Sequence, residues 1–408
     1  MPGAASFAAT GEGPCAVNIA FDDACAILAE DAVPLGVETA PLAGAGGRRL
    51  ARPVLAGIDS PRRDVAAMDG YALGPPRGAD GIFRSLGAIM AGDRAGHSVG
   101  PGEAYRVMTG APVPAGAQRV AMIEYCDVNG ADVTVARTSS GKLHIRRAGS
   151  DFRAGEILLE AGRLMTPAAL VAAAGGDRSD LELWRRPSVA ILATGNELAA
   201  PGKAAASCNA IPDSLSVAIA EFARLWGGVP QRFARAGDDA AAIALFCRDA
   251  EEDVVLILGG ASRGDRDFSR TSLLEAGLVP RFSDVAIRPG KPLWYGRLGA
   301  SHVLGLPGNP TAAMTAARLF LAPLLAGVGG ACPADALGWR PMPAAAPVPA
   351  NGPREAFLCA FAEGNHVRLL ERQEASSQGL LPRMTRLARR PANACAAPAG
   401  TMLDVLDF

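Results

Sequence analysis

Glycine, proline and charged residues follow short apolar runs at four places in the second half of the chain. These places are residues 194–197 (TGNE), 259–267 (GGASRGDRD), 288–291 (RPGK) and 306–310 (LPGNP). Glycine lets a backbone approach a ligand and offer its N–H groups. The arginines and lysine add positive charge, and the carboxylates are the hard oxygen ligands that Mg²⁺ prefers. Pro310 suits the first turn of a helix, and a helix N-terminus favours anions. Together the loops predict a site for a phosphorylated ligand with a divalent metal.

The segments around these loops alternate between strand and helix patterns. Strands are expected at residues 188–194, 229–236, 253–260, 285–292 and 302–308, and helices at residues 213–226, 238–250, 269–276 and 310–325. This alternation predicts a doubly wound, mostly parallel α/β domain over residues 183–330. In such a sheet ligands bind beyond the carboxyl ends of the strands, so the four loops should face one pocket.

Taken singly, each of the four loops is explained as well or better by a tight turn, because turns need glycine and proline. None of them fits GxxxxGK[ST] or a complete GxGxxG, so neither a P-loop nor a dinucleotide fingerprint is indicated. Their occurrence together in one strand–helix array is what favours a functional site.

Three further segments in the first half combine polar side chains with turns. Residues 64–71 (DVAAMDGY) place two carboxylates five positions apart, and residues 108–114 (MTGAPVP) form a rigid turn with one hydroxyl. Arg146 and Arg147 stand near Asp151. Each alone is more simply read as structural, since aspartate before glycine is common turn chemistry.

Turns and proline-rich stretches divide the rest of the chain into modules. A helix is expected at residues 17–30, regular Gly/Pro turns between short strands indicate a small β module, and residues 340–353 are proline-rich enough for a linker. The predicted parts are a disordered tail (1–16), a helix and strand linker domain (17–58 and 145–182), the small β module (59–144), the α/β domain (183–330) and a small β-rich C-terminal domain (331–408).

Composition excludes several classes of function. The 408 residues are 49% hydrophobic with a net charge of −1, so no bulk field would attract nucleic acid or an anionic membrane. No apolar stretch is expected to be long enough to span a bilayer, and the first residues lack the basic start of a signal peptide, so a cytoplasmic location is expected. The eight cysteines include no CxxC pair, which disfavours zinc and favours reduced, mostly packed thiols.

The motifs in combination resemble one known family. The matching strings are AMDGYA (67–72), MTGAPVP (108–114), RRPSVAILATGNEL (185–198), GGASRGDRD (259–267), AIRPGKP (286–292) and GLPGNP (305–310). In this order they are similar to the molybdopterin molybdenumtransferase family, which includes MoeA proteins and the E domain of gephyrin. The resemblance implies a four-domain subunit, a homodimer, and an active cleft between the α/β domain and the β module of the partner subunit. It implies a reaction that inserts molybdate into adenylylated molybdopterin with Mg²⁺ and releases AMP.

The resemblance also implies roles for individual residues. The acidic groups around ligand and metal would be Glu197, Asp238 and Asp267, with Glu197 and Asp267 as metal ligands. The phosphate-facing loop would be Gly259, Gly260, Ser262 and Gly264, and the pterin-side loop Pro307, Gly308, Asn309 and Pro310. Arg288 and Lys291 match basic positions for the oxyanion and terminal phosphate. The other domains would contribute Asp69, Thr109, Arg146 and Asp151.

The sequence departs from the family pattern at several positions. Val65 and Ala66 replace two polar residues, Leu215 replaces an amide, and Asp284 replaces a basic residue. Leu215 and Asp284 are expected in the cleft. Gln118-Arg119 replaces a small or acidic pair. These departures leave two alternatives to an active transferase: a paralogue that binds molybdopterin or its nucleotide without inserting metal, and a gephyrin-like scaffold, for which no receptor-facing segment is identifiable.

Overall fold

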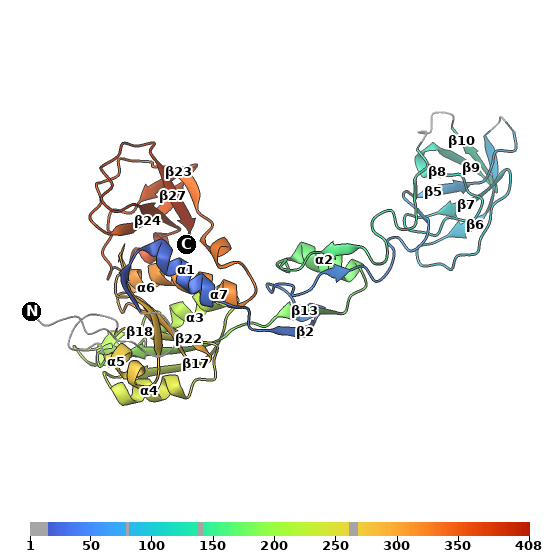
Figure 1. Cartoon of the computed structure of the whole chain (residues 1–408). Helices are drawn as coiled ribbons and strands as arrows, with labels where there is room; N and C mark the ends of the chain where they lie inside the picture. The colour runs from blue at the N-terminus through green and yellow to red at the C-terminus, as the bar shows by residue number, and fades with distance from the viewer. Residues whose placement is uncertain (1–14, 79–80, 137–141, 261–267) are drawn as a thin grey trace, which may run out of the picture. The chain divides into compact units, whose positions relative to one another are not determined.

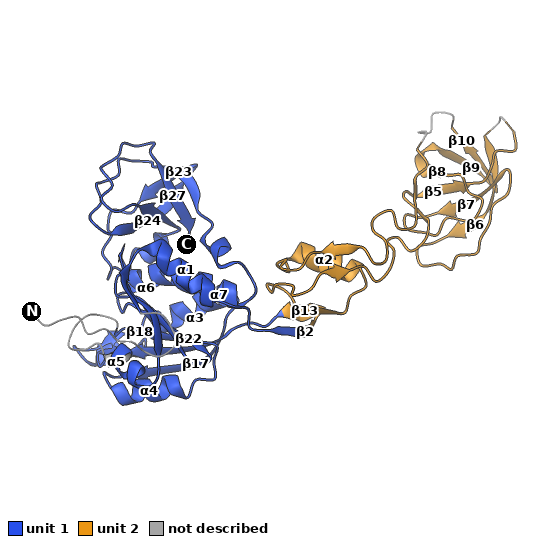
Figure 2. Ribbon diagram, in the orientation of Figure 1, with its two compact units in different colours: residues 1–38, 184–408 blue, residues 39–183 orange. Residues whose placement is uncertain are grey.

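The computed structural model describes residues 15–78, 81–136, 142–260 and 268–408. The chain divides into two compact units, residues 1–38 with 184–408 (unit 1) and residues 39–183 (unit 2), as Figure 2 shows. Each unit has its own buried apolar clusters. Unit 2 ends at Leu183, where the α/β pattern was predicted to begin.

Unit 1 is built on a seven-stranded sheet with the order β1-β19-β21-β22-β18-β14-β17. The strands are β1 (Ala16–Ile19), β19 (Val279–Val285), β21 (Trp294–Leu298), β22 (Ser301–Leu306), β18 (Val254–Leu258), β14 (Ser188–Thr194) and β17 (Val229–Ala236). The four strands β22, β18, β14 and β17 run parallel, as predicted. The rest of the sheet is mixed, because β21 is antiparallel to both of its neighbours. Strands β19 and β21 were not predicted, and of the strand predicted at residues 285–292 only Val285 belongs to this sheet.

Helices cover both faces of this sheet (Figure 1). They are α1 (Phe21–Asp31), α3 (Leu215–Leu225), α4 (Ala240–Arg248), α5 (Phe268–Glu275), α6 (Pro310–Ala316) and α7 (Ala322–Val328). Successive strand residues point to opposite faces. Accordingly, Ile191 packs with Ile219 of α3, whereas its neighbour Leu192 packs with Ile243 of α4.

The helical run Pro310–Val328 contains α6, a π-helical turn (Ala317–Leu321) and α7. At 19 residues it is longer and more apolar than any stretch expected from the sequence, and its length and hydropathy would suit a membrane span. However, 89% of its apolar window is buried inside the protein, as in the core helix of a globular domain.

The N-terminal segment corrects two predictions. Ala16–Ile19 is the strand β1, and the helix begins only at Phe21. Strand β1 pairs with β19, with Ala16 opposite Phe282, so residues 16–38 belong to unit 1 rather than to a linker domain. Local periodicity could not reveal a pairing between such distant segments.

A second sheet lies at the C-terminal end of unit 1 (Figure 1). Its strands are β20 (Ile287–Arg288), β24 (Glu355–Glu363), β26 (Arg386–Arg390), β27 (Met402–Asp407), β23 (Arg340–Pro343) and β25 (His366–Leu369). Phe357 and Leu387 share an apolar cluster with Ile191, so residue 331 is not a boundary between compact units. The expected linker is wrong: its start forms β23, an edge strand, where proline is tolerated.

Unit 2 contains the expected small β module, a six-stranded sheet with the order β8-β5-β7-β6-β10-β9. Its strands are β5 (Gly70–Leu73), β6 (Ile82–Ile89), β7 (Glu103–Val107), β8 (Arg119–Met122), β9 (Cys126–Asn129) and β10 (Asp132–Val135). The rest of the unit consists of two-stranded pairs and one helix: β2 (Val37–Pro41), β3 (Val54–Leu55), β4 (Val65–Ala66), β11 (Ile145–Arg146), β12 (Ile157–Leu159), β13 (Asp180–Trp184) and α2 (Pro167–Gly175). Thr166 caps α2 by accepting the N–H of Ala169 at 3.3 Å.

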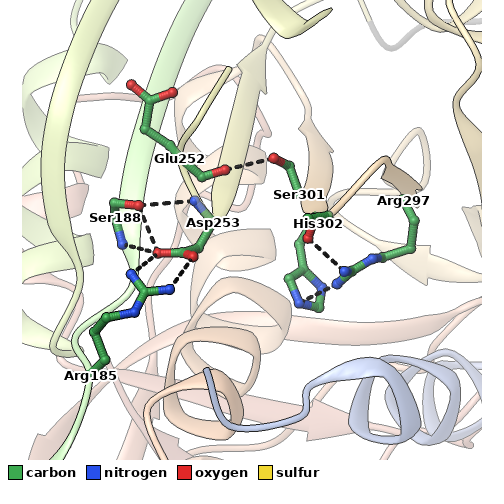
Figure 3. A network of polar contacts seen from close by, with 8 residues as sticks. Arg185, Ser188, Glu252, Asp253, Arg297, Ser301 and His302 are labelled. Carbon is green, nitrogen blue, oxygen red and sulfur yellow. Dashed lines mark hydrogen bonds and ion pairs between the residues drawn. The ribbon is translucent and has the colours of Figure 1, made fainter. Parts of the chain in front are cut away.

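The amino ends of the parallel strands are joined by a polar network (Figure 3). Asp253 accepts two hydrogen bonds from the Arg185 guanidinium, at 2.9 and 2.7 Å, and two from the backbone N–H and hydroxyl of Ser188, at 2.8 and 2.7 Å. Burial raises the pKa of Asp253, but these bonds outweigh it and hold the pKa below its ordinary value. The network therefore fixes the edge of the sheet opposite to the predicted ligand site.

A buried histidine adjoins the same network. His302 is 2% exposed, and burial lowers its pKa to about 3, so the ring is neutral at physiological pH. Arg297 bonds to Nε2, and a guanidinium can only donate, so Nε2 is the acceptor and Nδ1 carries the proton. Nδ1 therefore donates to Tyr295 Oη, at 2.8 Å.

Candidate functional site

A pocket of about 490 Å³ lies at the carboxyl ends of β14, β18 and β22. This first pocket is lined by Asp238 and by three of the four predicted loops, through Glu197, Gly259, Gly260, Pro307, Gly308, Asn309 and Pro310. The loops meet because the three strands are parallel neighbours, so their carboxyl ends share one edge of the sheet. The structure therefore brings these predicted residues together around one pocket.

The loops approach one another so closely that glycine is required at position 259. A Cβ on Gly259 would lie 2.8 Å from the carbonyl oxygen of Thr194, and the φ of Gly259 is +95°. A Cβ on Gly308 would lie 3.4 Å from the Cα of Gly259. The hydroxyl of Thr194 donates to the carbonyl of Leu258 at 3.3 Å and joins the first two strands at this edge. The backbone therefore forms the floor of the pocket.

Among the described residues three carboxylates line the first pocket, and two of them have fixed positions. Asn196 donates to Asp238 Oδ2 at 3.1 Å and accepts the Asp238 N–H at 3.2 Å. Asp213 accepts the backbone N–H and hydroxyl of Ser216, at 3.0 and 2.7 Å, and so caps α3. Glu197, which is exposed, remains the carboxylate best able to turn toward a ligand.

The described residues contain no group of three or more His, Cys, Asp or Glu side chains that could hold a metal ion. Mg²⁺ keeps several waters and is commonly held by one or two carboxylates together with substrate phosphates, so Glu197 still fits that chemistry. The predicted site residues Ser262, Gly264 and Asp267 lie outside the described residues.

A second pocket, of about 330 Å³, adjoins the first and shares Pro292, Pro307 and Asn309 with it. Its lining includes the predicted Arg288 and Lys291, and also Arg354 from the C-terminal sheet. The described lining residues include three basic side chains and one acidic side chain, Glu374. This pocket therefore favours an anion.

Arg354 reaches the second pocket through a strand pairing. Residues 287–288 form β20, which pairs in parallel with β24 of the C-terminal sheet, Ile287 opposite Glu355. The Arg354 guanidinium donates to the carbonyl of Ile287 at 3.3 Å. The place of Arg354 beside Arg288 depends on this long-range pairing.

The start of α6 does not offer the anion site that the sequence suggested. The N–H groups of Thr311 and Ala312 both donate to the carbonyl of Ala375, at 2.9 and 3.3 Å, and the N–H of Ala313 donates to Asn309. Pro310 has no N–H. The free donors of this helix start are therefore used within the protein.

Among the predicted residues of unit 2, Asp69 and Thr109 bond to each other, whereas Arg146 and Asp151 have separate partners. Asp69 Oδ1 accepts both the backbone N–H and the hydroxyl of Thr109, each at 2.7 Å, and these bonds, the backbone one first, lower the pKa of Asp69. Arg146 lies on β11 opposite Val65 of β4. Asp151 accepts the hydroxyl of Ser60 at 3.4 Å. The four predicted residues Asp69, Thr109, Arg146 and Asp151 are all exposed.

Two family models match the chain. The MoeA N-terminal region (domain I and II) matches residues 19–176, and a probable molybdopterin binding domain matches residues 190–327. A molybdopterin molybdenumtransferase of Synechococcus elongatus is 34% identical over 316 residues, which cover 73% of this chain and 77% of that protein. The chain belongs to the molybdopterin molybdenumtransferase family. Family members are transferases, and membership supports a role in molybdenum cofactor biosynthesis.

Other members agree with this assignment. Molybdopterin molybdenumtransferase 2 of Mycobacterium tuberculosis is 33% identical over 300 residues, covering 70% of this chain and 74% of that protein. The crystal structure of the molybdopterin biosynthesis MoeA protein from Pyrococcus horikoshii OT3 is 22% identical, with a TM-score of 0.80 over 96% of this chain and 100% of that one. At that identity it establishes the shared fold.

The departures from the molybdenumtransferase pattern have different locations. Leu215, 7% exposed, lines the first pocket, as expected. Asp284 is 6% exposed, has a φ of +54°, and is not among the described residues that line either pocket, so its expected place in the cleft is wrong. It is the penultimate residue of β19, where its backbone N–H donates to the carbonyl of Leu293 at 2.9 Å. Ala66 is buried in β4.

Sequence reasoning missed several residues that line the two pockets. Ser376 and Gln378 line the first, and Gln373 and Glu374 line the second. They lie in an irregular stretch after β25, far along the chain from the other loops. Local pattern gave no signal that this stretch would face the α/β domain.

Proposed function

We propose that this chain inserts molybdate into adenylylated molybdopterin and releases AMP, with Mg²⁺ as the assisting ion. The observation that carries this proposal is the pair of adjoining pockets. One has a glycine-rich backbone floor and carboxylates, and the other has Arg288, Lys291 and Arg354. This pairing suits a phosphorylated ligand beside a small oxyanion.

The physical task in such a reaction is to bring two anions together. Basic side chains offset their repulsion, and a divalent ion would polarise the phosphate whose bond to AMP must break. Fixing both reactants in neighbouring pockets supplies much of the rate, because a bimolecular step becomes effectively unimolecular. In this proposal Glu197 and Asp267 hold the Mg²⁺, and Lys291 and Arg288 hold the oxyanion.

The proposal includes a homodimer whose cleft is shared between subunits. Asp69, Thr109, Arg146 and Asp151 would enter the cleft from the partner's unit 2. Their exposure in this chain is compatible with that role, since each side chain is accessible to a ligand or to a second copy.

Reconstitution tests the reaction directly. Purified protein is incubated with adenylylated molybdopterin, molybdate and Mg²⁺, and AMP is measured by chromatography. We expect AMP only in the complete mixture and not when molybdate or Mg²⁺ is omitted. Asp267→Asn should weaken the Mg²⁺ dependence, because it removes a hard ligand. Absence of AMP from the complete mixture would reject the proposal.

A second function is favoured by one specific observation, the apolar side chain of Leu215 in the first pocket. A chain that has lost a polar contact there could bind molybdopterin or its nucleotide without inserting metal. Calorimetry separates the two functions. Tight binding of adenylylated molybdopterin without AMP release would favour the binding protein.

A further inference from the structure

Residues 373–378 form a wall that borders both pockets. Ser376 and Gln378 line the first pocket, and Glu374 lines the second. Along this segment, which we call the wall segment, residues 374, 376 and 378 are exposed, while residues 373, 375 and 377 are half-buried. One side of the segment is therefore attached to the protein, and the other side is available to ligands.

The first attachment of the wall segment is the side-chain amide of Gln373. Its Oε1 accepts the backbone N–H of Cys359 at 2.9 Å. Its Nε2 donates to the carbonyl of Cys359 at 2.9 Å and to the carbonyl of Leu370 at 2.7 Å. Cys359 belongs to β24 and is 1% exposed, so the segment is fixed to a rigid strand of the C-terminal sheet.

The second attachment is the start of α6. The carbonyl of Ala375 accepts the N–H groups of Thr311 and Ala312, and the hydroxyl of Thr311 donates to the carbonyl of Ser377. Thr311 is fully buried. The wall segment is thus held between the C-terminal sheet and the helix that follows the pterin-side loop.

We propose that Gln373 is a positioning residue: it holds the wall segment so that Ser376, Gln378 and Glu374 keep their places along the two pockets. This inference rests on the proposed function only for the identity of the ligands. Gln373 itself lines the second pocket, so a direct contact must be weighed. An anion needs N–H donors, and both donors of the Gln373 amide are already used. The amide therefore acts on ligands through the segment.

Gln373→Glu tests the role with little change in shape. Glutamate can still accept the Cys359 N–H, but it has no donors and sets a carboxylate against two carbonyl oxygens. Hydrogen exchange is measured first, in ligand-free protein. We expect the amides of Thr311 and Ala312 to exchange about tenfold faster, while the amide of Ile191 in β14 is unchanged. A residue that only contacted ligand would leave all these rates unchanged.

The second measurement uses inorganic molybdate as the probe. We expect its KM to rise about tenfold in Gln373→Glu with kcat within about twofold, because the reacting atoms are not touched. Gln231→Glu, the same charge change on the exposed face of β17, is the matched control and should alter neither exchange nor KM.

The outcomes decide the proposal in every case. Unchanged exchange at Thr311 and Ala312 in a folded Gln373→Glu protein overturns it. If that variant does not fold, Thr311→Val removes the bond to Ser377 and leaves Gln373 in place. A raised molybdate KM in Thr311→Val supports the wall segment as the acting element, and an unchanged KM overturns it. If Gln373→Glu shows the faster exchange but the wild-type protein has no turnover, the proposed function fails while the positioning role stands.

Discussion

Thr109 gives both its backbone N–H and its hydroxyl to one oxygen of Asp69, each at 2.7 Å. Both residues are exposed, although their turns lie 40 residues apart in the chain. An exposed carboxylate with two donors is held in its charged form and in one orientation. Because solvent rather than protein surrounds it, this pair is better placed to meet a ligand than to stabilise the fold.

Thr109→Val should remove one of the two hydrogen bonds that Asp69 accepts. The variant keeps the backbone N–H but loses the hydroxyl donor, so the pKa of Asp69 should rise toward its ordinary value. Carboxyl NMR titration measures this pKa, and turnover should fall about tenfold if the orientation of Asp69 matters in the cleft. Thr109→Ser retains the hydroxyl and serves as the control. An unshifted pKa in the valine variant would count against the geometry.

The sequence predicted much of both pockets but missed the part that the C-terminal sheet and residues 373–378 contribute, for a physical reason. Glu197, Gly259 and Asn309 follow parallel strands, so their convergence follows from strand order alone. Arg354 joins Arg288 only because β20 pairs with β24, and such long-range register leaves no local trace. Strand β21 did leave a trace: the two-residue turn between Leu298 and Ser301 is typical of a hairpin, but it was not recognised.

Lys291→Met should weaken oxyanion binding without disturbing the fold. Lys291 is half-buried in the second pocket, and methionine keeps the length of the side chain without its charge. The KM for molybdate should rise about tenfold at low salt. The difference between variant and wild type should shrink at high salt, because salt screens the charge of Lys291 in the wild type. Steady-state kinetics at two ionic strengths measures both effects. Lys203→Met, at an exposed loop position, is the control, and an equal effect there would refute the assignment.

Asp284→Lys should destabilise unit 1 rather than improve molybdate binding. Asp284 is buried in the left-handed region, where aspartate and asparagine are tolerated and a long charged side chain is not. We expect a loss of about 3 kcal/mol in the free energy of unfolding. Urea titration followed by tryptophan fluorescence measures it, because Trp184, Trp226, Trp294 and Trp339 all belong to unit 1. Asp284→Asn should unfold close to the wild-type midpoint. A tighter molybdate complex in the lysine variant would restore the charge-reversal interpretation.

His302 should make unit 1 sensitive to mild acid. Its pKa is lowered to about 3 in the folded protein by burial, whereas an unfolded histidine has a pKa near 6.5. Between these values the unfolded chain binds the extra proton, so stability falls as the pH falls, by up to about 1.4 kcal/mol for each pH unit. Urea titrations at pH 6.5 and 5, where most carboxylates remain ionised, measure the slope. The slope should be smaller in His302→Gln, and an equal slope in the variant would mean that another group titrates.

Mixing two variants of low activity, assayed at molybdate concentrations well below the wild-type KM, tests whether the cleft is shared between subunits. In the proposed dimer, each site takes Lys291 from one copy and Asp69 from the other. A heterodimer of Asp69→Asn and Lys291→Met then has one intact site and one doubly altered site. Equal co-expression gives heterodimers in half of the molecules, so activity should recover to about a quarter of the wild-type value. If both residues served a site within one copy, every site in the mixture would carry one substitution and no activity would return. The recovered fraction therefore distinguishes the two arrangements, and homodimers of each variant, purified separately, set the baseline.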